Sequence, residues 1–388
     1  MSDPLNPFPT VFKLAAECGA DWKSFGIAVE TTRKAEQALI RALVEEAKSE
    51  RLLDADSSLV LCGSFARYEM VPGSDCDWTL LINGVVSNEH ARTARLIGRA
   101  VENADTQAKG LKSPGTSGTF GNMTFSHDLV HRIGGGADSN HNLTRRILML
   151  LESRPVSLSP ADSSQTVWDS VVRSILERYF EEDAHFTPAA ERKVPRFLLN
   201  DLTRYWRTIG VDYAAKYLEQ DGKKWAIRNA KLRMSRKLLY AAGLAFCFAC
   251  QLRPPQRQRE EYDLFGDFDV TEHDTTAPYI ASAVAFAGAP PLEFLAAFVD
   301  NFVPDVAKRR AVSERVFGTY NEWLSLLGDD AARARLDTLS HAEADSDAIF
   351  QRVRRLSSDF AAGLKLLFFN RDADADPIAN LSLEYVGF

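Results

Sequence analysis

The spacing of hydrophobic residues changes several times along the first part of the chain. Residues 59–62 and 78–82 are short, almost uninterrupted apolar runs, which is typical of strands buried in a sheet. Residues 30–48 and 88–103 instead repeat apolar positions between charged ones at the period of an amphipathic helix. This pattern predicts two buried strands accompanied by helices, which is an α+β arrangement.

The pattern beyond residue 155 is almost wholly helical. A proline and small polar residues at 156–163 indicate a boundary, and the polar, proline-containing residues 253–278 indicate a second break. We therefore expect an α+β domain at residues 1–158 and a largely α-helical domain at residues 159–388, with a subdivision near 253–278. No internal repeat is visible.

A polar segment between the two predicted strands indicates a specific chemistry. Gly63 and Ser64 follow the first strand, and Asp75 and Asp77 precede the second, with Cys76 between them. Glycine permits close approach of the backbone, and a helix that begins there presents unpaired N–H groups to an anion such as a triphosphate. Side chains alternate along a strand, so Asp75 and Asp77 should project to one side and Cys76 to the other. Two carboxylates held in this way suit Mg²⁺, which prefers oxygen ligands and keeps positions for water and phosphates.

Each half of this segment also has an ordinary explanation. A Gly-Ser pair is usually a turn, and an Asp-x-Asp sequence usually lies on a solvated surface. Here the two halves occur together, and the acidic pair leads directly into an apolar strand, where an unpaired charge is costly. The combination favours a site for nucleotide and metal over a plain surface turn.

The same residues resemble a known signature. Residues 63–69 (Gly-Ser-Phe-Ala-Arg-Tyr-Glu) and 74–78 (Ser-Asp-Cys-Asp-Trp) are similar to the signature of the DNA polymerase β-like nucleotidyltransferase superfamily, in particular to its bacterial branch around the PII-uridylyltransferase-like domains. The resemblance implies a small mixed β-sheet that carries three acidic metal ligands, followed by helices that hold the nucleotide and the acceptor. It also implies that Ser64 contacts the phosphates and that Asp75 and Asp77 bind the metal ions.

The turn before the acidic pair is expected to bind the nucleotide. Gly63, Ser64 and Arg67 are the nucleotide-binding candidates that the turn supplies. Arg67 and Glu69 are expected to brace the turn rather than to take part in the chemistry.

The third acidic ligand is marked less clearly than the first two. The first candidate, as a catalytic and metal-binding residue, is Asp128 within the segment 122–130. In the competing interpretation Ser126 is a helix N-cap and Asp128 is only a favourable acid in the first turn. Glu152, which follows the apolar segment 147–151, is the reserve candidate; by the resemblance it could instead mark the end of the catalytic domain.

A second candidate region is strongly basic. Residues 223–237 hold seven basic side chains and no acidic one. Lys224, Arg228 and Lys231 share one face at helical spacing, with Trp225 beside them for packing or stacking. Long cationic side chains suit triphosphate oxygens or a nucleic-acid backbone, so we expect this face to bind phosphates. In the alternative interpretation the cluster pairs with an acidic surface elsewhere in the protein.

Composition narrows the class of protein only slightly. The 388 residues carry a net charge of −7, which argues against a dedicated nucleic-acid coat protein but leaves room for a local basic site. The five cysteines give no disulfide framework, and Cys247 and Cys250 fall in an apolar stretch that we interpret as a core helix. The N-terminus has no signal-peptide pattern, and no apolar stretch is long enough to span a bilayer. We therefore expect a cytoplasmic protein without a membrane partner.

The resemblance implies an enzyme that moves a nucleoside monophosphate from an NTP or dNTP to a hydroxyl or phosphate acceptor. Mg²⁺ or Mn²⁺ would be the cofactor and pyrophosphate the leaving group. No motif identifies the acceptor: a signal nucleotide or short oligonucleotide made in bacterial antiviral defence, a tRNA end and a protein side chain all stay open. The competing interpretations are a catalytically degenerate module that senses nucleotide or binds a protein partner, and a helical nucleic-acid adaptor.

Overall fold

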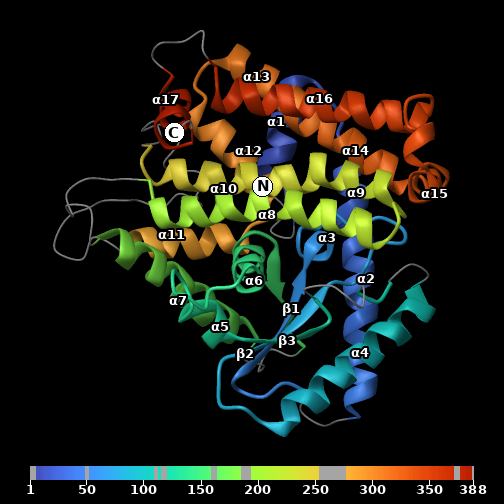
Figure 1. Ribbon diagram of the computed structural model, residues 1–388, viewed down its shortest axis with the longest axis vertical. Coiled ribbons are helices and arrows are strands. Elements are labelled where there is room, and N and C mark those ends of the chain that lie inside the picture. The colour runs from blue at the N-terminus through green and yellow to red at the C-terminus, as the bar shows by residue number, and fades with distance from the viewer. Residues whose placement is uncertain are drawn as a thin grey trace. The chain divides into compact units, whose positions relative to one another are not determined.

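The computed structural model describes most of the chain, and Figure 1 shows its elements. The described residues are 6–48, 52–108, 112–114, 120–158, 164–184, 194–252, 277–370 and 376–386. Contacts within the chain divide it into two units, each made of separate segments. Unit 1 consists of Met1–Gly26, Ala189–Asp269 and Pro291–Phe388, and unit 2 consists of Ile27–Pro188 and Val270–Pro290.

This division differs from the expected one. The boundary expected at residue 158 falls inside unit 2, because helix α7 (Ser164–Ala184) packs against strand β1 (Ser57–Cys62). Residues 1–26 belong to unit 1, and the break expected at 253–278 lies almost entirely outside the described residues. The composition of the chain changes near residue 158, but covering both faces of the sheet requires a helix that lies beyond this change. The expected boundary therefore differs from the observed one.

Unit 2 is built on a mixed four-stranded sheet with the strand order β3-β2-β1-β4. Its strands are β1 (Ser57–Cys62), β2 (Trp78–Ile82), β3 (Asn122–Phe125) and β4 (Ser153–Pro155). Strand β2 is antiparallel to β1 and parallel to β3, and β4 is antiparallel to β1. The α+β class is confirmed, and the two apolar runs expected to be strands form the two central strands of this sheet.

Both faces of this sheet are covered by helices. The helices of unit 2 are α2 (Lys23–Ala47), α3 (Gly63–Ala66), α4 (Asn88–Ala108), α5 (Ser126–Val130), α6 (Asn140–Leu151), α7 (Ser164–Ala184) and α11 (Ala277–Gly288). Leu59, Leu61 and Leu80 share a hydrophobic core with residues of α2 and α4. Val60 and Leu81, which point to the opposite face, are equally buried, and α7 packs against β1, β2 and β4. Polar chemistry is therefore confined to the ends of the strands.

Unit 1 is helical throughout its described part. Its helices are α1 (Pro9–Cys18), α8 (Arg196–Glu219), α9 (Trp225–Lys231), η1 (Leu232–Arg236), α10 (Lys237–Ala249), α12 (Pro291–Phe302), α13 (Val306–Ser313), η3 (Glu314–Gly318), α14 (Thr319–Gly328), α15 (Asp330–Thr338), η4 (His341–Glu343), α16 (Ala348–Phe368) and α17 (Pro377–Tyr385). Helix α10 packs against α8 and α12 (Figure 1), and Cys247 and Cys250 are buried at its C-terminal end, as expected for a core helix. No helix in the described part of the chain is long and apolar enough to cross a membrane.

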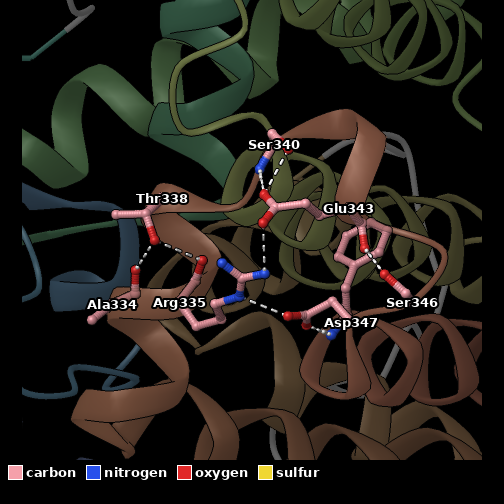
Figure 2. A network of polar contacts seen from close by, with 8 residues as sticks. Ala334, Arg335, Thr338, Ser340, Glu343, Ser346 and Asp347 are labelled. Atoms are coloured by element: carbon pink, nitrogen blue, oxygen red, sulfur yellow. Dashed lines mark hydrogen bonds and ion pairs between the residues drawn. The ribbon is translucent and has the colours of Figure 1, made fainter.

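Charged side chains fix the connection between α15 and α16. Figure 2 shows Arg335 between two acids: its Nε donates to Oδ2 of Asp347 (2.7 Å), and its Nη2 donates to Oε1 of Glu343 (3.4 Å). Glu343 also accepts from the backbone N–H of Ser340 (3.2 Å) in a capping box. Asp347 accepts from the N–H of Phe350 (2.8 Å) and so caps α16. Glu343 and Asp347 thus accept hydrogen bonds from backbone N–H groups at helix N-termini and also from the side chain of Arg335.

A buried carboxyl group joins the first helix of unit 1 to α12. Glu293 is 3% exposed, and its two oxygens accept hydrogen bonds from the backbone N–H groups of Thr10 (2.8 Å) and Val11 (3.2 Å) at the start of α1. Burial raises the pKa of Glu293 to about 7, although these hydrogen bonds act in the opposite direction. The contact ties residues 283 positions apart, which places the N-terminal helix in unit 1.

We expect the variant Glu293→Gln to change how unfolding depends on pH. A carboxyl with a pKa near 4.5 in the unfolded chain and about 7 in the folded one stabilises the native state below pH 4.5 and loses that stabilisation as the pH rises through 7. Relative to the variant, the wild type should therefore lose up to about 3 kcal/mol between pH 4.5 and pH 8. Urea unfolding of both proteins across this range measures the difference, and parallel profiles would contradict the raised pKa.

Candidate functional site

The turn after β1 brings a carboxylate into contact with a glycine. Gly63 begins α3 with a φ of 63°, in the left-handed region that favours glycine. A Cβ on Gly63 would lie 2.7 Å from Oδ2 of Asp77, so a larger residue would require the Asp77 carboxylate to shift. The N–H of Cys62 donates to the carbonyl of Asp77 (2.8 Å), and the N–H of Gly63 donates to the carbonyl of Glu152 (3.2 Å). These backbone hydrogen bonds hold Asp77 close to Gly63. Ser64 is half-buried at the second position of α3.

The burial of the acidic segment agrees with the expected alternation. Asp75 is exposed and Asp77 is half-buried, whereas Cys76 between them is fully buried. A parallel bridge to Lys112 keeps the segment extended: the N–H of Cys76 donates to the carbonyl of Lys112 (2.7 Å), whose own N–H donates to the carbonyl of Ser74 (3.2 Å). The two carboxylates therefore project from one side of a fixed extended segment.

The surroundings of this segment are strongly negative. Burial raises the pKa of the Cys62 thiol well above its usual value, and the carboxylates of Asp77 and Glu152 raise it further. Burial likewise raises the pKa of Cys76 well above its usual value, with further contributions from Asp77 and Asp75. Both thiols are therefore neutral at physiological pH. The negative potential that acts on them is one that a bound divalent cation would neutralise.

Arg67 lies in a buried cluster of ion pairs. It is 5% exposed; its Nε donates to Oε2 of Glu69 (2.9 Å), and its Nη1 donates to Oε2 of Glu152. Both glutamates are buried as well. Arg67 and Glu69 thus brace the turn, and the guanidinium is directed at these two carboxylates. Glu152, the reserve candidate for the third metal ligand, has its carboxylate engaged in this cluster.

In the part of the chain that the structure describes, no third acid forms a group of potential metal ligands with Asp75 and Asp77. Among the described residues, no group of three potential ligands with mutual distances within 4.8 Å includes the pair. Asp128 lies in the first turn of α5, and its Oδ1 is 3.4 Å from Nε of Arg132. This is the first-turn position of the competing interpretation, although Phe125 rather than Ser126 is the N-cap.

Strand β3, which precedes Asp128 in the segment 122–130, carries no acidic residue. Thr124 of β3 instead shares a hydrogen bond of 2.8 Å with the hydroxyl of Thr79 in β2. Thr79 lies two residues beyond Asp77 and therefore projects to the same face of the sheet. Hydroxyl side chains thus occupy the strand surface next to the acidic pair.

The basic segment 223–237 is not a single α-helix. It comprises α9, the π-helical segment η1 and the start of α10. Lys224 precedes α9 with a φ of 56°, and both Lys224 and Lys231 are exposed. Arg228 is half-buried, and its Nη2 donates to the side chain of Gln220. All of these residues belong to unit 1, whereas the acidic pair belongs to unit 2.

Trp225 is a core residue rather than a platform for stacking a base. It is 5% exposed, and its ring centroid lies 4.9 Å from those of both His341 and Phe350. The helical spacing placed it beside the lysines but could not show which of its neighbours would cover it.

Lys365 is a further cation close to this basic region. Burial lowers the pKa of Lys237, and the positive charges of Arg233 and Lys365 lower it further. Lys365 lies on α16, far away in sequence, so no local pattern could have added it to the cluster.

A second acidic group lies at the other end of the sheet. Asp54, Asp56 and His90 offer ligand atoms that lie within 4.8 Å of one another, and the group could hold a metal ion. The two aspartates precede β1, and His90 lies in the first turn of α4. Asp54 and Asp56 repeat the Asp-x-Asp spacing of Asp75 and Asp77, a signal that the sequence analysis did not use. His90 follows Asp56 by 34 residues and carries no local signal.

Comparisons with known proteins add no relative. No protein-family model matches the chain, and neither the curated proteins nor the solved structures contain a match. The resemblance carried by residues 63–69 and 74–78 therefore remains an expectation from the sequence.

We expect Gly63→Ala to be more harmful than its matched control, Gly134→Ala. Both glycines have a positive φ (63° and 69°), so each substitution introduces left-handed strain of about 1–2 kcal/mol. A Cβ at Gly134 has no atom within 4 Å, whereas one at Gly63 meets the Asp77 carboxylate at 2.7 Å. Shifting that carboxylate should cost about 1–3 kcal/mol more. Urea unfolding of both variants measures the difference, and equal losses of stability would contradict the contact.

We expect Arg67→Met to destabilise unit 2 strongly. The substitution leaves the carboxylates of Glu69 and Glu152 buried without their cation, which typically costs about 3–5 kcal/mol. Arg99→Met is the control, because Arg99 forms a largely exposed pair with Glu46 (3.2 Å) that is worth about 1 kcal/mol at most. Urea unfolding compares the two variants, and similar losses would argue against a bracing role for Arg67.

Proposed function

We propose that the segment from Gly63 to Asp77 binds a divalent cation and the phosphates of a nucleotide, and that it transfers the nucleotidyl group. The observation that carries this proposal is the contact between the Asp77 carboxylate and the backbone at Gly63. It brings the glycine-serine turn and the acidic pair, the two halves of the motif, into one small volume. A half-buried carboxylate next to a second one costs free energy, and a bound cation offsets that cost.

The residues present fit Mg²⁺ or Mn²⁺. Asp75 and Asp77 offer the oxygen ligands that these ions prefer, and the nearby thiols are neutral. Asp75 is exposed and Asp77 half-buried, which leaves positions for water and phosphate oxygens. When bound, the cation would neutralise phosphate charge and support the departing pyrophosphate.

The chain's own residues would act mainly by positioning. An acceptor oxygen bonds to the α-phosphorus while the bond to the bridging oxygen breaks, and pyrophosphate and a proton are released. The hydroxyl of Ser64 would donate to a phosphate oxygen, while the Arg67 cluster keeps the turn in place. The bridge between Asp75 and Lys112 keeps the carboxylates aligned, so little reorganisation accompanies the reaction.

The charges of unit 1 and of the whole chain bear on the identity of the acceptor. The exposed Lys224 and Lys231 of unit 1 suit a ligand that bears phosphate groups. The helical unit is larger than a minimal transferase needs, and the net charge of −7 disfavours long nucleic acids. We therefore favour a signal nucleotide or short oligonucleotide, as in bacterial antiviral defence, over a tRNA end or a protein side chain.

One observation favours a second candidate, a nucleotide-sensing module without turnover. No third acid joins Asp75 and Asp77 among the described residues, and two carboxylates suffice to bind a metal–nucleotide complex. Such a module would bind NTP with Mg²⁺ and release no pyrophosphate.

The test is a screen of the four NTPs and four dNTPs with Mg²⁺ or Mn²⁺, with products identified by mass spectrometry. We expect Asp77→Asn and Asp75→Asn to lower pyrophosphate release by about 100-fold or more, since each removes a ligand charge at the reacting phosphates. Asp128→Asn tests the third candidate, whose Oδ1 lies 3.4 Å from Nε of Arg132. Circular dichroism checks that each variant is folded.

The outcomes separate the candidates. Full activity of folded Asp77→Asn would refute the assignment. Nucleotide binding without turnover in the wild type would favour the sensing module. Loss of activity in Asp128→Asn would show that Asp128 joins the pair once nucleotide is bound.

A further inference from the structure

We propose that Asp54, Asp56 and His90 form a binding site for a divalent transition-metal ion, separate from the Asp75–Asp77 pair. Their ligand atoms lie within 4.8 Å of one another. The donors are two carboxylate oxygens and one imidazole nitrogen. This set suits Zn²⁺ or Mn²⁺, whereas Mg²⁺ and Ca²⁺ are bound almost entirely by oxygen.

The orientation of His90 supports this assignment. The side chain is 3% exposed, its Nε2 lies 3.4 Å from Oδ1 of Asp56, and its Nδ1 is buried without a hydrogen-bond partner among the described residues. A direct N–H···O bond is usually shorter, about 2.7–3.2 Å. Two ligands that lie about 2.1 Å from one ion in tetrahedral geometry are separated by about 3.4 Å. The spacing thus suits an ion shared by Nε2 of His90 and Oδ1 of Asp56.

The backbone around the aspartates forms a cradle for this group. The carbonyl of Asp56 accepts from the N–H of Asn83 (2.8 Å), and a Cβ on Gly84 would lie only 2.0 Å from Oδ2 of Asp56. The N–H of Asp54 donates to Oγ of the buried Ser57 (2.9 Å), whose N–H donates back to the carbonyl of Asp54 (3.2 Å). The backbone of both aspartates is therefore fixed, and the carboxylate of Asp56 lies against Gly84.

The topology makes this site independent of the proposed nucleotide site. Asp54 and Asp56 precede β1, Asp75 and Asp77 precede β2, and these two strands are antiparallel. The two acidic pairs therefore lie at opposite ends of the strands, roughly 16 Å apart for the five residues of β2. A single ion cannot bridge them. The new site would instead tie the start of β1 and the loop after β2 to the first turn of α4.

The experiment uses the full chain with Asp75→Asn and Asp77→Asn, so that the acidic pair before β2 no longer competes for the metal. The protein is stripped with a chelator and dialysed against Zn²⁺ or Mn²⁺, and the bound metal is counted by mass spectrometry. We expect about one ion per chain and a rise in the melting temperature when the ion is added. Asp54→Asn in the same background should weaken binding by about tenfold or more and remove the thermal shift.

The choice of Asp54 keeps the test decisive. Asp54 is exposed, so its replacement by asparagine should leave the fold intact, and Asp56→Asn provides a second variant. Glu89→Gln is the matched control: Glu89 is exposed, adjacent to His90 and paired with Arg92 (3.5 Å), and its loss should not change metal binding. Absence of bound Zn²⁺ and Mn²⁺ from the stripped and dialysed protein would overturn the proposal. Unchanged affinity in both Asp54→Asn and Asp56→Asn would do the same.

Discussion

The buried cation of Arg67 is the interaction on which the turn after β1 depends. Glu69 approaches it from the same turn, and Glu152 approaches it from the junction between α6 and β4. Glu152 also accepts the N–H of Gly63 through its carbonyl, so one residue fixes both the backbone and the charge of the turn. Because Gly63 is held in this way, Asp77 can pack its carboxylate against it. The arginine thereby holds the turn against which the Asp77 carboxylate lies.

The antiparallel pairing of β1 and β2 explains why one sequence pattern can lead to two different chemistries. An Asp-x-Asp sequence leads into each strand, and the opposite strand directions send the two pairs to opposite ends of the sheet. At one end the pair meets a glycine and a serine, which leaves room for a ligand's phosphates. At the other end it meets the imidazole of His90, a nitrogen donor. A difference in ion preference between the two proposed sites would therefore come from the neighbours rather than from the aspartates themselves.

Local patterns predicted the centre of the sheet well and its edge poorly. The apolar run 78–82 is β2 to the residue, because a continuous buried strand carries its own signal. Strand β4 has only three residues and ends in Pro155, so its existence depends on pairing with β1 and not on its composition. In the candidate site, the acidic pair and the turn could be found from spacing alone. The partners of Arg67 and the place of Trp225 depend on contacts between distant parts of the chain, which no local pattern contains.

The distribution of charge constrains how the acidic pair could handle a nucleotide. A triphosphate carries more negative charge than one divalent cation neutralises, so further positive groups are needed. Arg67, the cation of the motif itself, is directed at Glu69 and Glu152 and so lies within a cluster that is negative in sum. Lys112 is an exposed cation whose backbone pairs with Asp75, and among the described residues of unit 2 it is placed to meet this need. The proposed metal binding would require only the carboxylates, whereas firm binding of a triphosphate would also require cations such as Lys112.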